Sequence, residues 1–318
     1  MKLNLKIITI GLSILLLAAT LRFWNLNAFP IFADEAIYVR WSQVMQAESS
    51  LRFLPLSDGK QPLFMWATIP LLKFFSDPLL AGRVLSGLAG LGTIIGLGLA
   101  SYFLFSNFRL SLLTVLLAAA MPYLVFFDRM AMVDSLLAMF LVWTFVFSYL
   151  SFVHKRLDLA MFAGFALGFA WLTKSPAMFA FGLLPLNFLI VKPHPRHLVY
   201  LLTTYVIAFG MYNILRLGQE FHQIALRNAD YVFPLAEIIS HPLDPLLPHL
   251  KDSFLFFAYF LTPLGLLTAI SGILAVGRSH WQSRLILAAW WLGPTLAQSA
   301  IARAFTARYL LFTVPFAV

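Results

Sequence analysis

SLLAMFLVWTFVFSYLSFV, residues 135–153, is a long apolar run that contains no charged side chain. A helix needs about 20 such residues to cross the hydrocarbon core of a bilayer. The run also lacks the alternation of apolar and polar residues that a strand of a membrane β-barrel requires. Comparable runs cover most of the chain: 7–23, 80–105, 110–127, 159–173, 176–191, 198–215, 254–276, 285–301 and one that starts near 309. The sequence therefore predicts an all-α, polytopic transmembrane helical bundle.

The composition supports the same class of protein. Hydrophobic residues make up 61% of the 318 residues and charged residues only 11%, and the mean hydropathy is +0.86. Soluble domains are about 45–50% apolar. The chain contains no cysteine, which excludes disulfides, thiolate metal sites and cysteine nucleophiles. We expect a single domain over residues 1–318 that is truncated in its last helix, because the final apolar run stops at Val318.

The distribution of basic residues predicts an orientation. If successive runs cross the membrane alternately, one side has Asp158 as its only acid and collects these basic residues: Lys2, Lys6, Arg109, Lys155, Arg156, Lys192, Arg196, Arg278 and Arg284. Short cytoplasmic loops are rich in Lys and Arg. We therefore predict a multi-pass protein of the cell membrane with a cytoplasmic N-terminus, in contact with the lipid bilayer and with no nucleic acid partner. The short runs 159–173 and 176–191 leave an alternative, because as one re-entrant unit they would invert the later orientation.

Two long connections fall on the opposite, outer side: residues 24–79 and 216–253. Both are too apolar and aromatic to be disordered, and long ordered loops are often functional. Within the first, residues 62–75 are rich in aromatic side chains and predict a helix that lies in the membrane interface. The run that follows contains several glycines, and pairs such as Gly92 and Gly96 predict close packing of that helix against a neighbour.

Two adjacent acids, Asp34 and Glu35, follow the first apolar run. A carboxylate beside a bilayer is costly to desolvate, which favours a functional site. Both acids could instead lie in water and cap a helix. The residue types alone leave these two interpretations open.

Five short motifs occur along the chain in this order: Asp34-Glu35 with Tyr38, Lys60-Gln61-Pro62-Leu63, Asp134-Ser135-Leu136, Leu172-Thr173-Lys174-Ser175-Pro176 and Arg308-Tyr309-Leu310-Leu311. Together they resemble the GT-C type membrane glycosyltransferases, in particular the branch of the protein O-mannosyltransferases and the lipid A aminoarabinose transferases. The chain departs from the pattern of that branch at Ile37, Gln61, Ser175 and Phe312, where arginine, proline, glycine and proline are usual. These departures argue against an aminoarabinose donor and leave the reaction class intact.

The resemblance implies an inverting glycosyltransferase of the GT-C fold. Such an enzyme moves a sugar from a polyprenyl-phosphate-linked donor to an acceptor hydroxyl on the outer face of the membrane. The acceptor stays open among protein, lipid and polysaccharide. Phosphate is a stable leaving group, so cationic side chains suffice to stabilise it, and a single carboxylate is needed at the acceptor.

The resemblance also implies roles for individual residues. Asp34 would be the general base, and Glu35 would orient it or bind the acceptor. Lys60 is the first choice for the donor phosphate and Arg308 the second. Asp134 would hold the sugar hydroxyls or pair with one of these cations. The remaining members of the predicted substrate-binding set are Tyr38, Lys174 and Tyr309.

Two other function classes compete with an enzyme. A transporter or flippase for a lipid-linked sugar or polyprenyl phosphate predicts polar residues near mid-bilayer in two repeated halves. A structural scaffold would not need these acids and cations to converge. No metal ligand is assigned, because His222, His241 and His249 lie among prolines that break helical ligand spacing. A divalent metal nevertheless stays open as a cofactor.

Overall fold

The computed structural model describes residues 5–189, 191, 194–275 and 280–318. These residues form helices and no sheet, apart from a lone antiparallel bridge between Val232 and Ala302. The predicted all-α fold is confirmed. By length and composition, four of the described helices could cross a membrane, and as many as six if each bent pair counts as one span. The chain is a multi-pass membrane protein.

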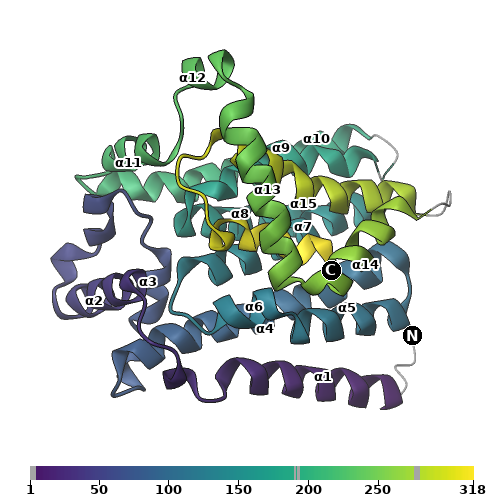
Figure 1. Ribbon diagram of the computed structural model, residues 1–318, viewed down its shortest axis with the longest axis horizontal. Helices are drawn as coiled ribbons and strands as arrows, with labels where there is room; N and C mark the ends of the chain where they lie inside the picture. The colour runs from purple at the N-terminus through teal and green to yellow at the C-terminus, as the bar shows by residue number, and fades with distance from the viewer. Residues whose placement is uncertain (1–4, 190, 192–193, 276–279) are drawn as a thin grey trace.

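The long helices lie side by side and run in alternating directions (Figure 1). Their apolar composition favours helices because only a helix or a closed barrel satisfies every backbone hydrogen bond inside a bilayer. Local signals set their ends: the Asp77 side chain accepts from the amide of Leu79 where one helix starts, and Lys155 adopts a left-handed conformation where another stops. These helices are α1 (Leu5–Phe23), α4 (Pro78–Phe105), α7 (Val133–His154), α8 (Leu157–Thr173), α10 (Pro195–Tyr212) and α15 (Trp281–Ile301).

Two spans are bent rather than straight. The pair α5 (Phe108–Ala120) and α6 (Pro122–Asp128) bends by 54°, and the pair α13 (Leu243–Phe260) and α14 (Thr262–Leu274) bends by 113°. The apolar run predicted over 254–276 is therefore divided between two helices. Pro263 lacks an amide hydrogen and Thr262 has a positive φ of 67°, so the helix cannot continue through this point.

The chain returns across the bundle between α8 and α10. This return is an irregular run of three short pieces: η5 (Ser175–Met178), α9 (Phe179–Leu183) and η6 (Leu184–Leu189). The Tyr200 hydroxyl donates to the carbonyl of Lys155 at 2.8 Å, so α10 starts where α7 ends. The path from the end of α8 back to the end of the bundle where α7 stops is the one that alternating runs predict. Lys2, Lys192 and Arg278 lie outside the described residues.

Helix α4 packs closely against α7, as its glycines predict. A Cβ at Gly92 would lie 2.5 Å from the sulfur of Met139, and one at Gly96 would lie 2.7 Å from a methyl of Val142. Such contacts require a residue without a side chain. The glycines of α4 are explained by packing.

Short helices cover one end of the bundle, at the left and top of Figure 1. Residues 62–75 do not form one helix, because Pro70 separates α3 from η4, and Phe64 and Met65 are fully buried within the protein. These two side chains therefore do not face lipid, as an interfacial helix would require. The elements at this end are η1 (Leu26–Ala28), α2 (Ala33–Ala47), η2 (Ser49–Leu51), η3 (Leu54–Asp58), α3 (Leu63–Thr68), η4 (Leu71–Lys73), η7 (Asn213–Leu217), α11 (Gln223–Tyr231) and α12 (Leu235–Ser240).

Candidate functional site

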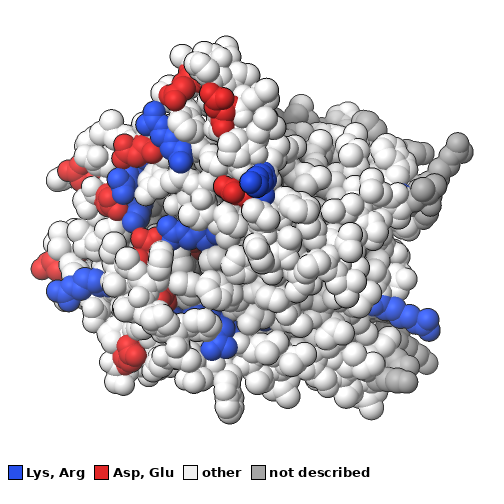
Figure 2. All heavy atoms as spheres, in the orientation of Figure 1, with Lys and Arg blue, Asp and Glu red and all other residues white. Residues whose placement is uncertain are grey.

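A cavity of about 370 Å³ opens at this covered end. It lies where the ends of α7, α8 and α15 meet α2, α11 and the start of η8 (Ala307–Ala317). Charged side chains of both signs gather over the same end, whereas most of the rest of the visible face is uncharged (Figure 2). The cavity is therefore the polar centre of a largely apolar molecule.

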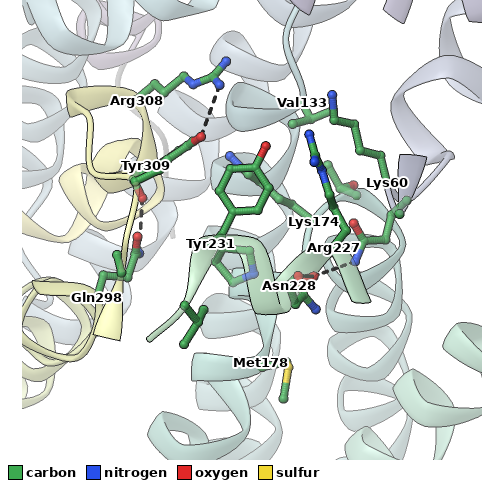
Figure 3. Close-up of a pocket in the computed structure, with 18 of the residues that line it drawn as sticks. Lys60, Val133, Lys174, Met178, Arg227, Asn228, Tyr231, Gln298, Arg308 and Tyr309 are labelled. Carbon is green, nitrogen blue, oxygen red and sulfur yellow. Dashed lines mark hydrogen bonds between the residues drawn. The ribbon is translucent and has the colours of Figure 1, made fainter. Parts of the chain in front are cut away.

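The structure brings most of the predicted site residues to this cavity. Glu35 and Asp134 do not line it, although Val133, next to Asp134, does. Figure 3 shows Lys60 and Arg227 on one side of the cavity and Arg308 and Tyr309 on the other, with the Lys174 side chain reaching toward Tyr309. The predicted residues that line it are Asp34, Tyr38, Lys60, Lys174, Arg308 and Tyr309.

Asp34 lies in the first turn of α2 and forms an ion pair with Arg308 through its Oδ2 atom. Its Oδ1 atom accepts no hydrogen bond from the described residues. Arg308 also donates to the Tyr309 hydroxyl at 3.3 Å. Burial opposes the charge of Arg308, but Asp134 and the hydrogen bond to Asp34 outweigh it and raise the pKa of the guanidinium. Arg308 therefore remains a cation beside the Asp34 carboxylate.

Glu35 points away from the cavity into the protein. Its carboxylate is fully buried and accepts from Nε and Nη2 of Arg83, both at 2.9 Å. It also accepts from the amide of Phe32 at 3.0 Å, which caps α2, and from the amide of Ala131 at 2.6 Å. Of the two roles that the sequence suggested for Glu35, this position suits orienting Asp34 and does not suit binding an acceptor.

Asp134 and Lys174 form a second ion pair, in which Lys174 lines the cavity and Asp134 lies behind it. Lys174 Nζ lies 2.6 Å from Asp134 Oδ1 and 4.5 Å from the centre of the Tyr309 ring. Asp134 is buried, and its Oδ2 atom has no hydrogen-bond partner. Asp134 thus pairs with Lys174, and not with Lys60 or Arg308, the two cations that the sequence suggested for it.

A third group combines Lys60 with a cation that the sequence did not suggest. Asp58 holds both: its carboxylate lies 3.1 Å from Lys60 Nζ and 3.7 Å from Arg227 Nε. Lys60 Nζ also lies 5.3 Å from the centre of the Tyr38 ring. Burial and the charges of Asp34 and Asp134 raise the pKa of the Tyr38 phenol well above its usual range. Tyr38 is therefore a neutral hydrogen-bond donor.

Polar side chains from three segments also meet in the wall. Gln61 Nε2 donates to Ser175 Oγ at 2.8 Å, and Ser175 Oγ donates to Asn228 Oδ1 at 3.2 Å. Sequence reasoning missed Arg227 and Asn228, which lie on α11 and match none of the family motifs. Their role depends on a tertiary contact between α11 and η3 that no local pattern predicts.

The histidines of the second outer segment do not converge. His222 and His241 are exposed, and His249 contacts the carbonyl of Ser299 at 3.0 Å. Within the part of the chain that the structure describes, no group of three His, Cys, Asp or Glu side chains could hold a metal ion.

The described residues form a bundle of apolar helices with an acid and several cations gathered at one covered end. Comparison with solved structures assigns this arrangement to the GT-C membrane fold. ArnT from Cupriavidus metallidurans, bound to undecaprenyl phosphate, matches with a TM-score of 0.66 and 17% identity, over 98% of this chain and 57% of that one. Its apo state matches with a TM-score of 0.67, 18% identity and the same coverage. The oligosaccharyltransferase of Archaeoglobus fulgidus in its apo form matches with a TM-score of 0.58 and 13% identity, over 98% of this chain and 49% of that one.

The sequence comparison names a family. Residues 59–215 match the model of the dolichyl-phosphate-mannose-protein mannosyltransferases, so the predicted resemblance to the GT-C mannosyltransferase-like proteins is confirmed. The chain spans a little more than half the length of ArnT. No curated protein matches it by sequence.

Proposed function

We propose that this chain is the membrane-embedded catalytic part of an inverting glycosyltransferase. It transfers a sugar from a polyprenyl-phosphate-linked donor to an acceptor hydroxyl on the outer face of the membrane. The observation that carries the proposal is that Asp34 lines the same cavity as Lys60, Lys174 and Arg227. The bound undecaprenyl phosphate of ArnT, and the inhibitory peptide and dolichol-phosphate of an Archaeoglobus fulgidus relative, support a lipid phosphate and an acceptor in this fold.

Asp34 acts as the general base. Arg308 occupies Oδ2 and fixes the plane of the carboxylate, which leaves Oδ1 for the acceptor hydroxyl. A base must reach the proton that it removes within hydrogen-bond distance, and the cavity gives the acceptor that access. The hydroxyl oxygen attacks the anomeric carbon as its proton moves to Asp34, and the bond from that carbon to the phosphate oxygen breaks. Attack from the face opposite the phosphate inverts the anomeric centre.

Lys60 and Arg227 bind the donor phosphate. They share Asp58, so both cations lie near one small anion. A phosphodiester that enters between them gains two charged contacts that strengthen as negative charge builds on the leaving oxygen. Arg308, the second choice from the sequence, is engaged by Asp34 and serves to orient the base.

Lys174 supplies a further cation to the cavity, and Asp134 holds that cation in place. Because Asp134 is buried behind the wall and holds Lys174 at 2.6 Å, its role is to position the ammonium group. Glu35 is likewise a positioning residue, since it fixes the first turn of α2 and hence Asp34.

The cavity opens on the outer face in this proposal. The opposite end of the bundle carries Arg109, Lys155, Arg156, Arg196 and Arg284 at helix ends and short connections, as cytoplasmic loops do. A transporter would place charged groups along the middle of its spans. The cavity's charged side chains lie at helix ends, which favours an enzyme.

The test is transfer of a radiolabelled sugar from a polyprenyl-phosphate donor by the protein in membrane vesicles. Asp34→Asn keeps the size of the side chain and removes the base, so the transfer rate should fall by about 100-fold or more. Glu48→Gln is the matched control, because Glu48 is an exposed acid at the other end of the same helix. Near-normal transfer by Asp34→Asn, or an equal loss in Glu48→Gln, would refute the assignment.

A further inference from the structure

We infer that Gln61, Ser175 and Asn228 form the surface that binds the hydroxyl groups of the donor sugar and selects which sugar is accepted. This inference rests on the proposed glycosyltransferase function and deepens it. The three side chains are called the amide–hydroxyl face below.

The amide–hydroxyl face is a built feature of the cavity. Its members come from the loop before α3, from η5 and from α11, yet two hydrogen bonds of 2.8 and 3.2 Å join them in a chain. All three line the cavity, and the Gln61 residue is only 5% exposed. Because each member holds the next, the face has a fixed geometry before a ligand arrives.

The face keeps unused hydrogen-bonding capacity. Gln61 Oε1 and Asn228 Nδ2 have no hydrogen-bond partner among the described residues. The amide–hydroxyl face therefore presents an acceptor at its Gln61 end and a donor at its Asn228 end. A sugar hydroxyl both donates and accepts, and neighbouring hydroxyls on a ring match this arrangement. The adjoining wall is largely apolar, with Pro176, Met178 and Phe179. A ligand that cannot hydrogen-bond to the face leaves its polar atoms unpaired, which is a strong basis for discrimination.

The amide–hydroxyl face lies next to the cations, where the sugar of a bound donor would be. Gln61 directly follows Lys60, Ser175 follows Lys174, and Asn228 follows Arg227. Consecutive Cα atoms are about 3.8 Å apart, so each polar residue is anchored beside one of the cations. The sugar of a polyprenyl-phosphate donor is bonded directly to its phosphate. A phosphate held by these cations therefore brings the sugar ring to the amide–hydroxyl face.

The charges around the face favour a neutral sugar. Asp34 is the only acid among the described residues that line the cavity, and it is paired with Arg308. The other nearby carboxylates, Asp58 and Asp134, are paired with Lys60, Arg227 and Lys174. A sugar ammonium group at the face would therefore lie beside three cations and find no free carboxylate, which is unfavourable in a partly buried site. The substrate class is a hydroxylated, uncharged sugar.

The experiment compares donors and variants in one binding assay. Undecaprenyl phosphate bearing mannose, glucose, galactose or 4-amino-4-deoxyarabinose is added to the purified protein, and affinity is measured from the rise in unfolding temperature. We expect at least one neutral donor to bind tighter than the amino sugar donor. Ser175→Ala and Asn228→Ala should each reduce the ratio between the best and worst neutral donors by about tenfold or more. Both should bind sugar-free undecaprenyl phosphate as the unaltered protein does, which also reports their folding.

Gln223→Ala is the control, because Gln223 lies on the same helix and does not line the cavity. Unchanged ratios in both variants, or tightest binding of the amino sugar donor, would overturn the inference. Transfer is measured alongside binding. Absence of transfer with every donor would count against the proposed function, whereas transfer with unaltered selectivity in the variants would count against the amide–hydroxyl face alone.

Discussion

Glu35 and Arg83 form an ion pair with no exposed side-chain surface, in which Nε and Nη2 of the guanidinium each lie 2.9 Å from a different carboxylate oxygen. Arg83 also donates to the carbonyl of Leu26 in the segment before α2, and Glu35 also accepts from the amide of Ala131. The pair thus joins α4, the start of α2 and the segment that leads to α7. It fixes the turn from which Asp34 enters the cavity.

Removal of one partner of this pair should be strongly destabilising. Glu35→Ala leaves the Arg83 guanidinium buried without a counter-charge, and we expect a loss of about 3–5 kcal/mol in the free energy of unfolding. Unfolding in mixed detergent micelles measures this loss. Gln46→Ala, at an exposed position near the end of α2, should change stability by less than about 0.5 kcal/mol.

A double variant separates stability from positioning. Glu35→Leu with Arg83→Met replaces the pair by apolar side chains and should recover the part of the lost stability that comes from the unpaired guanidinium. The amides and carbonyls that the pair held stay without a partner, so the recovery should be partial. Transfer should nevertheless stay reduced, because the leucine no longer holds the amides of Phe32 and Ala131. If Glu35→Ala proved as stable as the unaltered protein, the structural role given to the pair would be wrong.

Gly90 makes room for the second buried pair, Arg22 with Asp128, whose charged atoms lie 2.9 Å apart. A Cβ at Gly90 would lie 2.2 Å from Asp128 Oδ2 and 2.7 Å from Arg22 Nε. Gly90→Ala should therefore cost about 1–3 kcal/mol through overpacking. At Gly210 a Cβ meets nothing within 4 Å, so Gly210→Ala in a helix interior should stabilise by about 0.5–1 kcal/mol. Equal effects of the two changes, measured by unfolding in detergent, would contradict the packing described for Gly90.

The helices could be predicted from the sequence because the apolar runs are long, and their ends carry local signals such as Asp77 and Pro78. The bend between α13 and α14 is signalled in the sequence by Pro263. A mean hydropathy over a window of residues does not detect it, because the residues on both sides are apolar. The split of residues 62–75 depends on Pro70, whereas the burial of Phe64 depends on tertiary packing.

The site was predictable only where residues fall in motifs. Asp34, Lys60 and Arg308 were found in this way, and the structure places them around one cavity. Arg227 was not found, because it acquires a role only when α11 packs on η3 near Asp58. The partner of Glu35 lies 48 residues away on another helix, a pairing that no local spacing encodes.

Removal of either cation beside Asp58 should weaken donor binding. Lys60→Gln and Arg227→Gln should each raise the KM for a polyprenyl-phosphate donor by about 10- to 100-fold, as expected when a hydrogen bond to a charged group worth about 1.5–3 kcal/mol is removed. Lys73→Gln is the control, because Lys73 is exposed and does not line the cavity. The measurement is initial rate against donor concentration at fixed ionic strength. A similar rise in Lys73→Gln would indicate a general attraction to the surface and not a phosphate site.

The orientation of the bundle can be tested by labelling single cysteines, since the chain has none of its own. Ser49→Cys lies at the cavity end and Lys155→Cys at the opposite end, and both positions are exposed. We expect a membrane-impermeant maleimide added to intact cells to label position 49 and to reach position 155 only after the membrane is permeabilised. The reason is the concentration of basic residues at the end that holds Lys155, which favours the cytoplasm. The reverse pattern would place Asp34 on the cytoplasmic side and contradict transfer to an acceptor outside, whereas labelling of both positions in intact cells would contradict the alternating spans.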